Sequence, residues 1–466
     1  MKVLLVNPYF DSHIITPPLG LGYISAYIKA KCPGIEVSII DCLARNMGND
    51  RLIKFIAGAK PDLIGLSVYS TFYAQVREII RDVKKLDNNI KVAIGGPHVS
   101  ALPSFSLEDT LSDFAICGEG EETFAELINQ LSSGANDYSA INGLCFRDSG
   151  NAIKVNPPRK LIEDLNTLDW PDWKEINPAG YPAAPHGGLY KRFPVAPLIT
   201  TRGCPFGCKF CGTRVTWRGS IRYRNKLDVV DEMEFLVKDY GVREFHFEDD
   251  NFTFERSHAY GICREIIKRK LDIVWACPNG VRIDTIDDDL LEIMKMSGCY
   301  LLAFGIESGS QDILDSMGKR LDKAMVSAVV RKTRDAGIET WGFFIIGLPG
   351  ENRQTVRESI DFAKRLPLDR AQFCNFVPIP GTPLFDSWVK GQNFSSLKDI
   401  KWEDLNFYGR STHTFSHLDV RDIAKLQKKA FMSFYGRPRI ILKLISKVKL
   451  RQIAFLSRRF KEYILK

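Results

Sequence analysis

TTRGCPFGCKFCG, residues 200–212, places three cysteines, Cys204, Cys208 and Cys211, at CxxxCxxC spacing. Three thiolates can ligate three irons of a 4Fe-4S cluster and leave the fourth iron open to a small molecule. A structural zinc site normally takes four ligands, and no nearby Cys or His completes this set. Core thiols without a metal are the other alternative. The spacing predicts an iron–sulfur site with one open iron.

The composition is that of a globular protein with a large core. The chain has 466 residues, 45% hydrophobic and 26% charged, and this length predicts two or three domains. The first residues, MKVLLVNPYF, run directly into a strand pattern without the apolar region of a signal peptide. No apolar stretch reaches the ~18–20 residues of a spanning helix. We therefore expect a cytoplasmic protein whose eight scattered cysteines are mostly small buried side chains.

The net charge of +8 is concentrated at the C-terminus, where residues 421–466 contain fourteen Lys and Arg against two acidic residues. On a helix, Lys443, Lys447, Arg451 and Arg458 share one face and apolar residues another. Such a helix can lie on an anionic membrane surface, or it can pack on the preceding domain with its basic face in solvent. No nucleic acid is expected as a partner, because aromatic residues are not interleaved to stack on bases.

The first 140 residues alternate strand and helix patterns. Short β-branched runs end in Gly, Pro, Asn or Asp in KVLLVNP, EVSIID, LIGLSV, KVAIGG and FAICG. Helix-length segments lie between them, over 20–31, 50–59, 72–86 and 121–131. This alternation predicts an α/β fold with a Rossmann-like, doubly wound parallel sheet. Ligands bind such sheets at the carboxyl ends of the strands.

A second alternation predicts a barrel-like domain over 195–390. Residues 141–194 read as a connector with a hairpin at GLCFRDSGNAIKV and a Pro-rich passage. Six strands follow in PLITT, REFHFED, IVWACPN, LLAFGIE, WGFFIIG and AQFCNFV. Six strands rather than eight predict an open (β/α)6 partial TIM barrel, with a helical region and basic tail over 391–466. The cysteine loop directly follows the first of these strands, at the end where barrels build their active sites.

CxxxCxxC with an aromatic residue, Phe210, before the last cysteine resembles the radical S-adenosylmethionine (SAM) superfamily. The resemblance covers about residues 195–390 and implies that SAM chelates the open iron and is cleaved to a deoxyadenosyl radical. It also implies an external one-electron reductant of the flavodoxin or ferredoxin type.

The strand ends carry the SAM contacts that the resemblance implies. FEDDNFT offers acidic groups for the methionyl ammonium, although it lacks the family's GGE triplet, and its Asp or Asn can instead cap a helix. The arginine of NGVRID would pair with the methionyl carboxylate unless it forms a surface salt bridge. FGIESGSQ would face the ribose or carboxylate, and GFFIIGLPGE would support adenine. The SAM residues so implied are Phe210, Asp249, Asp250, Asn251, Arg282, Glu307, Ser308, Ile346 and Gly347.

The N-terminal segments TPPLGLGYISAYIK, GLSVYST, IGGPHVSALP and CGEGEET resemble cobalamin-binding domains fused to radical SAM barrels. The Ser motif and the Gly-Gly pair would line the channel for the nucleotide tail of the corrin. Asp11-Ser12-His13 reproduces the DxH of the cobalt-ligand motif, but Thr16 stands where that motif has Gly, so we expect no imidazole on cobalt. A nucleotide-type sheet without cobalamin is the alternative. The cobalamin residues so implied are Thr16, Leu19, Gly20, Ser67, Val68, Tyr69, Gly95, Gly96, His98 and Glu119.

Together the two resemblances imply an enzyme of the group that contains anaerobic magnesium-protoporphyrin cyclase and class B radical SAM methyltransferases. The expected reaction is methylation of an unactivated carbon in a small-molecule or lipid-like substrate. A cyclase or rearrangement enzyme that uses cobalamin without methyl transfer is one alternative. An electron-transfer or sensing protein is another, and a tRNA-modifying enzyme is disfavoured because no compact RNA-binding domain follows the barrel.

Overall fold

The computed structural model describes residues 1–466 except 11, 13, 184–189, 393, 409–414 and 446–466. It forms two compact units. The first comprises residues 1–181, 210–220 and 378–403, and the second comprises 182–209, 221–377 and 404–466. No helix among the described residues is long and apolar enough to cross a membrane.

The first unit contains a seven-stranded sheet in the order β2-β1-β3-β4-β5-β6-β7. Its strands are β1 (Lys2–Asn7), β2 (Glu36–Asp41), β3 (Leu63–Ser67), β4 (Lys91–Gly95), β5 (Phe114–Ile116), β6 (Leu144–Arg147) and β7 (Ile153–Val155). The first five strands are parallel. The hairpin β6–β7, predicted as part of a connector, instead extends this sheet antiparallel to β5.

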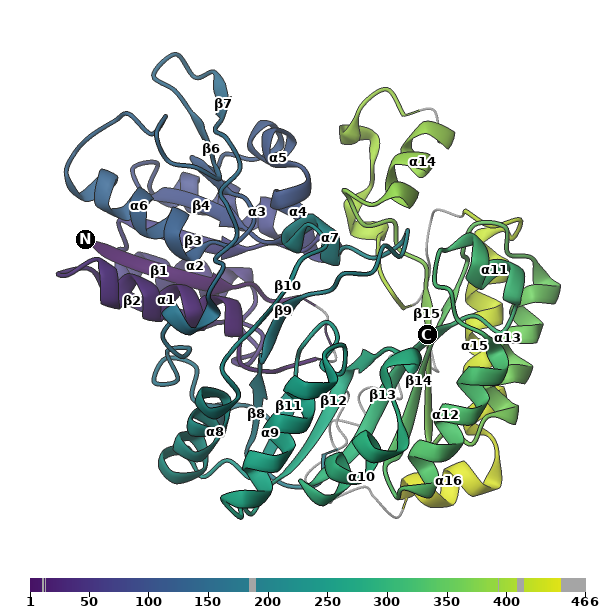
Figure 1. The fold of residues 1–466 in the computed structure, drawn as a ribbon. Helices are drawn as coiled ribbons and strands as arrows, with labels where there is room; N and C mark the ends of the chain where they lie inside the picture. Colours follow the sequence, from purple (N-terminus) through teal and green to yellow (C-terminus); the bar gives the residue numbers. More distant parts are fainter. Residues whose placement is uncertain (11, 13, 184–189, 393, 409–414, 446–466) are drawn as a thin grey trace. The chain divides into compact units, whose positions relative to one another are not determined.

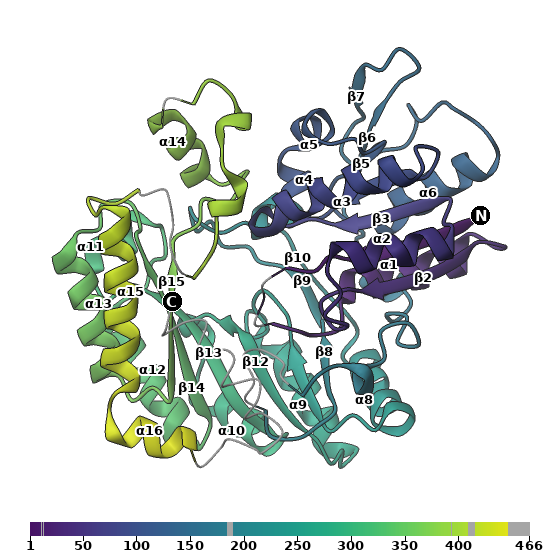
Figure 2. The same ribbon diagram turned by 180° about the vertical axis from the view of Figure 1, so that it is seen from behind.

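Helices cover both faces of this sheet (Figures 1 and 2). They are α1 (Leu19–Lys31), α2 (Asn49–Ala59), α3 (Tyr73–Leu86), α4 (Pro97–Ala101), α5 (Pro103–Asp109) and α6 (Glu121–Ser132). α1 packs against α6, and α2 packs against α3. The strand order 2-1-3-4-5 places the switch of winding direction between β1 and β3, where ligands bind doubly wound sheets.

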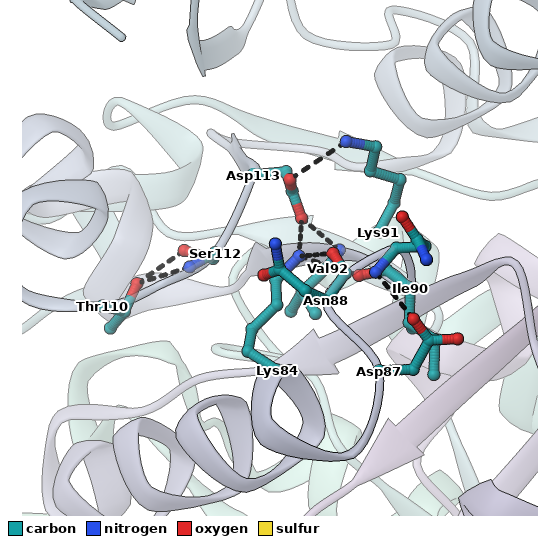
Figure 3. Close-up of polar contacts among 10 residues, drawn as sticks. Lys84, Asp87, Asn88, Ile90, Lys91, Val92, Thr110, Ser112 and Asp113 are labelled. Atoms are coloured by element: carbon teal, nitrogen blue, oxygen red, sulfur yellow. Dashed lines mark hydrogen bonds and ion pairs between the residues drawn. The ribbon is translucent and has the colours of Figure 1, made fainter.

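Polar contacts join the amino ends of β4 and β5 (Figure 3). Lys84 donates from Nζ to Asp113 Oδ2 over 2.7 Å and to the carbonyl oxygen of Ile90 over 2.8 Å. The same carboxylate accepts from the Val92 amide over 2.8 Å. This partly buried ion pair therefore holds the sheet at the end opposite to the predicted ligand edge.

The second unit is built on a six-stranded parallel sheet in the order β15-β14-β13-β12-β11-β8. Its strands are β8 (Val195–Leu198), β11 (Glu244–Phe247), β12 (Val274–Val281), β13 (Cys299–Glu307), β14 (Glu339–Ile346) and β15 (Arg370–Asn375). β8 and β15 do not pair with each other, so the barrel is open. The predicted α/β fold with an N-terminal sheet and an open six-stranded barrel is confirmed.

Helices pack on the outer face of this sheet (Figure 1). They are α8 (Lys226–Tyr240), α9 (Arg256–Lys268), α10 (Asp288–Met296), α11 (Gln311–Ser316), α12 (Lys323–Asp335), α13 (Arg353–Arg365), α15 (Val420–Tyr435) and α16 (Pro438–Ile445). Side-chain caps fix several helix starts, including a capping box of Asn352 and Thr355 on α13. The buried rings of Phe247, Phe252 and Trp275 contact one another with centroids 4.7–5.6 Å apart.

A short antiparallel ribbon follows β8 and was not predicted. It pairs β9 (Thr201–Gly203) with β10 (Ile221–Tyr223). The cysteine motif begins immediately after β9, so the ribbon defines the direction in which the loop leaves the sheet.

Candidate functional site

The first part of the cysteine loop is held by the second unit. The Phe206 ring contacts Phe254 edge-on at a centroid distance of 5.6 Å, and the Arg282 guanidinium lies 3.7 Å from its centroid. The Lys209 amide donates to the Met317 carbonyl over 3.1 Å, and its Nζ donates to the Ser316 carbonyl over 2.8 Å. Aromatic, cationic and backbone contacts therefore fix the segment that carries Cys204 and Cys208.

The last part of the motif lies in the first unit, which the chain enters at Phe210. Cys211 Sγ lies 3.1 Å from the hydroxyl of Thr213, the first residue of α7 (Thr213–Trp217). A Cβ on Gly212 would approach Ile379 to 3.0 Å, so a small residue is required after the last cysteine. Among the described residues no three His, Cys, Asp or Glu side chains are already gathered as metal ligands. The joint ligation by the three cysteines therefore stays a prediction from their spacing.

The other cysteines are poor candidates for metal ligation. Burial raises the thiol pKa of Cys32, Cys42, Cys117, Cys145, Cys263, Cys277, Cys299 and Cys374. A raised pKa disfavours the thiolate, which is the form that binds metal. The cysteines of the motif are half-buried, as are Cys117 and Cys374, and the other six are buried.

Two buried cations interact with the charges of the motif cysteines. Burial works against the charge of Arg282, but its hydrogen bonds with Asp284 and the charges of Asp284, Cys208 and Cys204 raise its pKa. Burial likewise opposes the charge of Lys319, and the charges of Glu307 and Cys208 raise its pKa. The donor set and its electrostatic surroundings thus fit an anionic iron–sulfur cluster.

Arg282 is engaged by protein groups. Nε and Nη2 donate to the two carboxylate oxygens of Asp284 over 2.9 and 2.7 Å, and Nη2 also donates to the Lys319 carbonyl over 3.2 Å. Arg282 thus forms the salt bridge that the sequence offered as an alternative, although its own side chain is buried and Asp284 is half-buried. Its predicted contact with the methionyl carboxylate remains a prediction.

Asp249 braces the turn before the cysteines. Its Oδ1 accepts from the amide and hydroxyl of Thr200 at 2.9 and 3.1 Å, and from the amide and hydroxyl of Thr201. The other oxygen, Oδ2, is buried without a partner among the described residues. Burial raises the pKa of this carboxyl to about 6. One oxygen therefore orders the loop, while the other is open to a donor.

The next two predicted residues differ in exposure. Asp250 is exposed, whereas Asn251 is buried and accepts at Oδ1 from the amide of Arg282 over 3.4 Å. The Asn251 Nδ2 is a buried donor without a partner among the described residues. Neither residue caps α9, whose N-cap is Glu255. The capping alternative is therefore wrong for this pair.

The end of β13 carries a buried ion pair. Glu307 has a positive φ of 66° and accepts at Oε1 from Lys319 Nζ over 2.9 Å. The sequence analysis missed Lys319, because a lysine in a helix–helix loop reads as solvated. Ser308 is buried, and its hydroxyl lies 3.1 Å from that of Ser359 on α13. That contact holds the strand end against the helix.

The end of β14 is stabilised by a second carboxyl that the sequence analysis missed. Gly347, with φ of 94°, and Leu348 donate their amides to Glu351 Oε2 over 2.7 and 3.1 Å. Glu351 Oε1 is buried without a partner among the described residues, and burial raises the pKa of this group to about 7. Ile346 is buried beside this turn. Glu351 is the last letter of GFFIIGLPGE, and this signal was available in the sequence.

The first unit gathers most predicted cobalamin residues at the carboxyl ends of its strands. Ser67 ends β3 and is followed by Val68 and Tyr69, and Gly95 ends β4 and is followed by Gly96. The Val68 amide donates to the Gly95 carbonyl over 2.8 Å. A Cβ on Gly96 would lie 2.7 Å from the Val68 carbonyl oxygen, so the two strand ends meet here without room for a side chain.

Glycines leave open space around this edge. A Cβ on Gly20, near the start of α1, or on Gly118, after β5, would meet nothing within 4 Å. Leu19 is buried, whereas Thr16 is half-buried and Tyr69 is exposed. The edge therefore suits the close approach of a nucleotide-like tail. Asp11 and His13 lie outside the described residues.

Two predicted cobalamin residues have structural side-chain roles. His98 is 1% exposed, stacks on Tyr73 at 4.1 Å, and meets Trp402 edge-on at 4.7 Å. Burial lowers its pKa to about 3, and Nδ1 lies 3.0 Å from the Ser70 hydroxyl. Glu119 accepts from the Ile162 amide over 2.8 Å and so holds the connector. The other ring nitrogen of His98, Nε2, is buried without a partner among the described residues.

Comparisons with known proteins match both halves of the chain. The family described as the radical SAM superfamily matches residues 198–363, and the B12 binding domain matches residues 2–128. An uncharacterized methyltransferase of Pyrococcus horikoshii is 32% identical over 95% of this chain and 94% of its own length. A cytidylyl-2-hydroxyethylphosphonate methyltransferase of Streptomyces wedmorensis is 30% identical over 84% of this chain and 82% of its own.

The chain belongs to the cobalamin-dependent radical SAM methyltransferase family. It is therefore an enzyme that works with a 4Fe-4S cluster, SAM and cobalamin, and it needs a reductant and a substrate. The interpretation as a non-catalytic electron-transfer or sensing protein is wrong.

Further relatives of this radical SAM enzyme include a cyclase. An anaerobic magnesium-protoporphyrin IX monomethyl ester cyclase of Rubrivivax gelatinosus is 28% identical over 83% of this chain and 69% of its own. Among solved structures, the methyltransferase TsrM of Kitasatospora setae, with cobalamin and a 4Fe-4S cluster bound, matches with a TM-score of 0.71. That match has 20% identity and covers 94% of this chain and 89% of the other. At this identity it shows the likeness of the fold.

Proposed function

We propose that this enzyme transfers a methyl group from SAM to an unactivated carbon of a small-molecule or lipid-like substrate. The observation that carries the proposal is the cysteine loop placed beside two buried cations, Arg282 and Lys319, at the carboxyl end of the six-stranded sheet. The methyltransferases that share most of its length support methyl transfer as the outcome.

In this proposal Cys204, Cys208 and Cys211 hold the cluster. When bound, the cluster and cobalamin supply the electron for SAM cleavage and the carrier for the methyl group. The chain contributes a loop clamped by Asp249 before the first cysteine and by Arg282 on Phe206 within it. The cysteine loop is therefore held in place by protein contacts, and a preformed loop favours the proximity and orientation of bound reactants.

The strand ends of the second unit would bind SAM. Asp249 Oδ2 is the buried acceptor best suited to the methionyl ammonium, and Asn251 Nδ2 is a buried donor suited to a carboxylate or hydroxyl. Glu307 would face the ribose, with its charge held by Lys319. Ile346 and Gly347 would support adenine through apolar and backbone contacts. The remaining predicted contacts, those of Phe210, Asp250, Arg282 and Ser308, stay part of the proposal.

The strand ends of the first unit would hold the cobalamin tail. Ser67, Gly95 and Gly96 offer backbone and small side chains at the carboxyl ends of β3 and β4, and β3 borders the switch of the sheet. We keep the predicted division into a cobalamin domain (1–140), a connector (141–194), a barrel (195–390) and a helical region (391–466) as part of this proposal.

Anaerobic purification, followed by iron, sulfide and cobalamin analysis and a SAM-cleavage assay, tests the assignment. Cys208→Ala is expected to lose most of the iron and all deoxyadenosine formation. Cys32→Ala, a buried thiol in the first unit, is the matched control and is expected to keep both. Full iron content in Cys208→Ala, or a wild-type protein that does not cleave SAM once its cluster is reduced, would contradict the proposal.

A cyclase or rearrangement enzyme is the second candidate, favoured by the relative from Rubrivivax gelatinosus. Product mass separates the two functions. Methylation adds one CH2 unit to the substrate per turnover, whereas cyclisation and rearrangement leave its carbon count unchanged.

The C-terminal helices α15 and α16 expose apolar side chains that could contact a membrane. Ile441 and Leu442 of α16 are 42% and 69% exposed, and Phe431 and Met432 at the end of α15 are 40% and 51% exposed. Basic residues accompany them, and the charged tail continues over 446–466, outside the described residues. We propose that this basic, apolar surface makes peripheral contact with anionic lipid, which would suit a lipid-like substrate.

A further inference from the structure

Lys319 and Glu307 form an ion pair that is almost completely buried. Lys319 Nζ lies 2.9 Å from Glu307 Oε1, and the two side chains are 8% and 10% exposed. A buried ammonium is costly unless a charged partner and hydrogen bonds compensate it. Glu307 also occupies the left-handed region, with φ of 66°, which a non-glycine residue adopts only when its surroundings hold it there. Such a costly arrangement suggests a role beyond stability.

The pair lies against the cysteine loop. The Lys209 amide donates to the Met317 carbonyl over 3.1 Å. A Cβ on Gly318 would lie 3.7 Å from the Gly207 carbonyl oxygen. The Lys319 carbonyl accepts from Arg282, which stacks on Phe206. Residues 316–319 therefore run alongside residues 206–209.

Charge interactions agree with this placement. The charge of Cys208 is among the causes that raise the pKa of Lys319 despite its burial. The ammonium is thus a fixed positive charge close to one predicted iron ligand, and Glu307 is its counter-charge.

We propose that Lys319 is a positioning residue that holds a positive charge beside Cys208 and raises the reduction potential of the cluster, with Glu307 moderating that effect. The inference rests on the proposed cluster site. A nearby cation stabilises the form that has gained an electron, and net charge is one of the levers that set cluster potentials. The external one-electron reductant supplies that electron, and the cluster accepts it.

Removing Lys319 and removing the charge of Glu307 are expected to shift the reduction potential of the cluster in opposite directions. Lys319→Met removes the cation and is expected to lower the potential, so that a smaller fraction of the cluster is reduced at a fixed solution potential. Glu307→Gln leaves the cation uncompensated and is expected to raise the potential. Lys319→Arg keeps the charge and is expected to stay near the wild type. A purely structural role would not give opposite shifts.

Lys84 provides a matched control in the other unit. Its Nζ lies 2.7 Å from Asp113 Oδ2, and its side chain is 7% exposed (Figure 3). Lys84→Met therefore also breaks a partly buried lysine–carboxylate pair, but far along the chain from the cysteines. It is expected to lower stability without moving the potential.

The experiment is a spectroelectrochemical titration of the reconstituted full-length proteins without SAM, followed by SAM binding. At the wild-type midpoint, the reduced fraction is expected to fall several-fold in Lys319→Met and to rise in Glu307→Gln. Equal potentials in wild type, Lys319→Met and Glu307→Gln would overturn the inference. If Lys319→Met does not fold, an unchanged potential in Glu307→Gln overturns it alone. A wild-type protein without a cluster would instead overturn the proposed function.

Discussion

The Arg282 guanidinium lies 3.7 Å from the centroid of the Phe206 ring, between the first two cysteines of the motif. Asp284 fixes the guanidinium through two hydrogen bonds of 2.9 and 2.7 Å. A desolvated cation–π contact contributes about 2 kcal/mol. Arg282 therefore orders the loop as well as being a candidate for ligand binding.

Phe206→Leu should weaken the loop while keeping an apolar side chain. The loss of the cation–π contact is expected to cost ~1–2 kcal/mol in loop order, which should accelerate iron loss in a chelator challenge several-fold. Phe254→Leu is the control, because it removes the edge-on ring but leaves Arg282 over Phe206. Equal rates of iron loss in both variants would contradict this role for Arg282.

The two glycines at the carboxyl end of β4, Gly95 and Gly96, should respond differently to alanine. Gly96 has φ of 111° and a Cβ there would lie 2.7 Å from the Val68 carbonyl oxygen, so Gly96→Ala is expected to cost ~3 kcal/mol in unfolding free energy. A Cβ on Gly95 would lie 3.7 Å from the Ile116 carbonyl oxygen, an ordinary contact.

Gly95→Ala should therefore fold normally and lose cobalamin affinity, because the new methyl group occupies the proposed tail channel. Urea unfolding and cobalamin absorbance after gel filtration measure the two effects. Undiminished cobalamin retention in Gly95→Ala would exclude Gly95 from the binding edge.

Glu351 should make stability depend on pH. Its folded pKa is raised from 4.5 to about 7 by burial. Between these values the unfolded chain loses the proton while the folded protein keeps it, so this group's contribution to stability falls as pH rises through that window. The expected loss is about 3 kcal/mol. Glu351→Gln should flatten this dependence in urea unfolding between pH 5 and 8, and an identical slope in both proteins would contradict the prediction.

The surface of α16 should bind anionic vesicles. Leu442→Glu places a charge on a side chain that is 69% exposed, and losing one inserted leucine is expected to weaken binding at least tenfold. Co-sedimentation with vesicles that contain anionic lipid measures the binding affinity. Added salt should weaken the binding of the wild type. Phe55→Glu, at an exposed apolar position of α2, is the control. Equal binding of the wild type and Leu442→Glu would remove the membrane proposal.

The strands could be predicted because each is an apolar run between turn residues. CYLLAFGIE, buried along almost its whole length in β13, is the clearest example. The ribbon β9–β10 could not be predicted in this way, because TRG and IRY are too short for any alternation to be visible. The placement of residues 378–403 in the first unit depends on the long-range packing of Trp402 against Tyr73 and His98. No local pattern carries that information.

The site could be predicted in its ligand types but not in its supporting contacts. The cysteines follow from spacing alone. Lys319 becomes notable only through its burial, which depends on how distant segments pack. Asp249 and Ser308 were expected to face a ligand, yet the structure also gives them bonds within the protein. A sequence motif predicts which residue types lie at a site, whereas the hydrogen-bond partners of those residues depend on how the chain folds.

The bonds of Asp249 to Thr200 and Thr201 have a consequence for how mutational data should be interpreted. One carboxylate oxygen orders the chain before the cysteines, and the other is open. Loss of activity in Asp249→Ala could then arise from iron loss, from weaker SAM binding or from both. In Asp249→Asn the amide oxygen can still accept the hydrogen bonds of Thr200 and Thr201, whereas the acceptor Oδ2, unpartnered among the described residues, is replaced by an NH2 donor. Comparison of the Asn and Ala variants therefore separates the effect on the loop from the effect on SAM binding. In a deep mutational scan, the difference between Asn and Ala at position 249 is the informative quantity about the ligand.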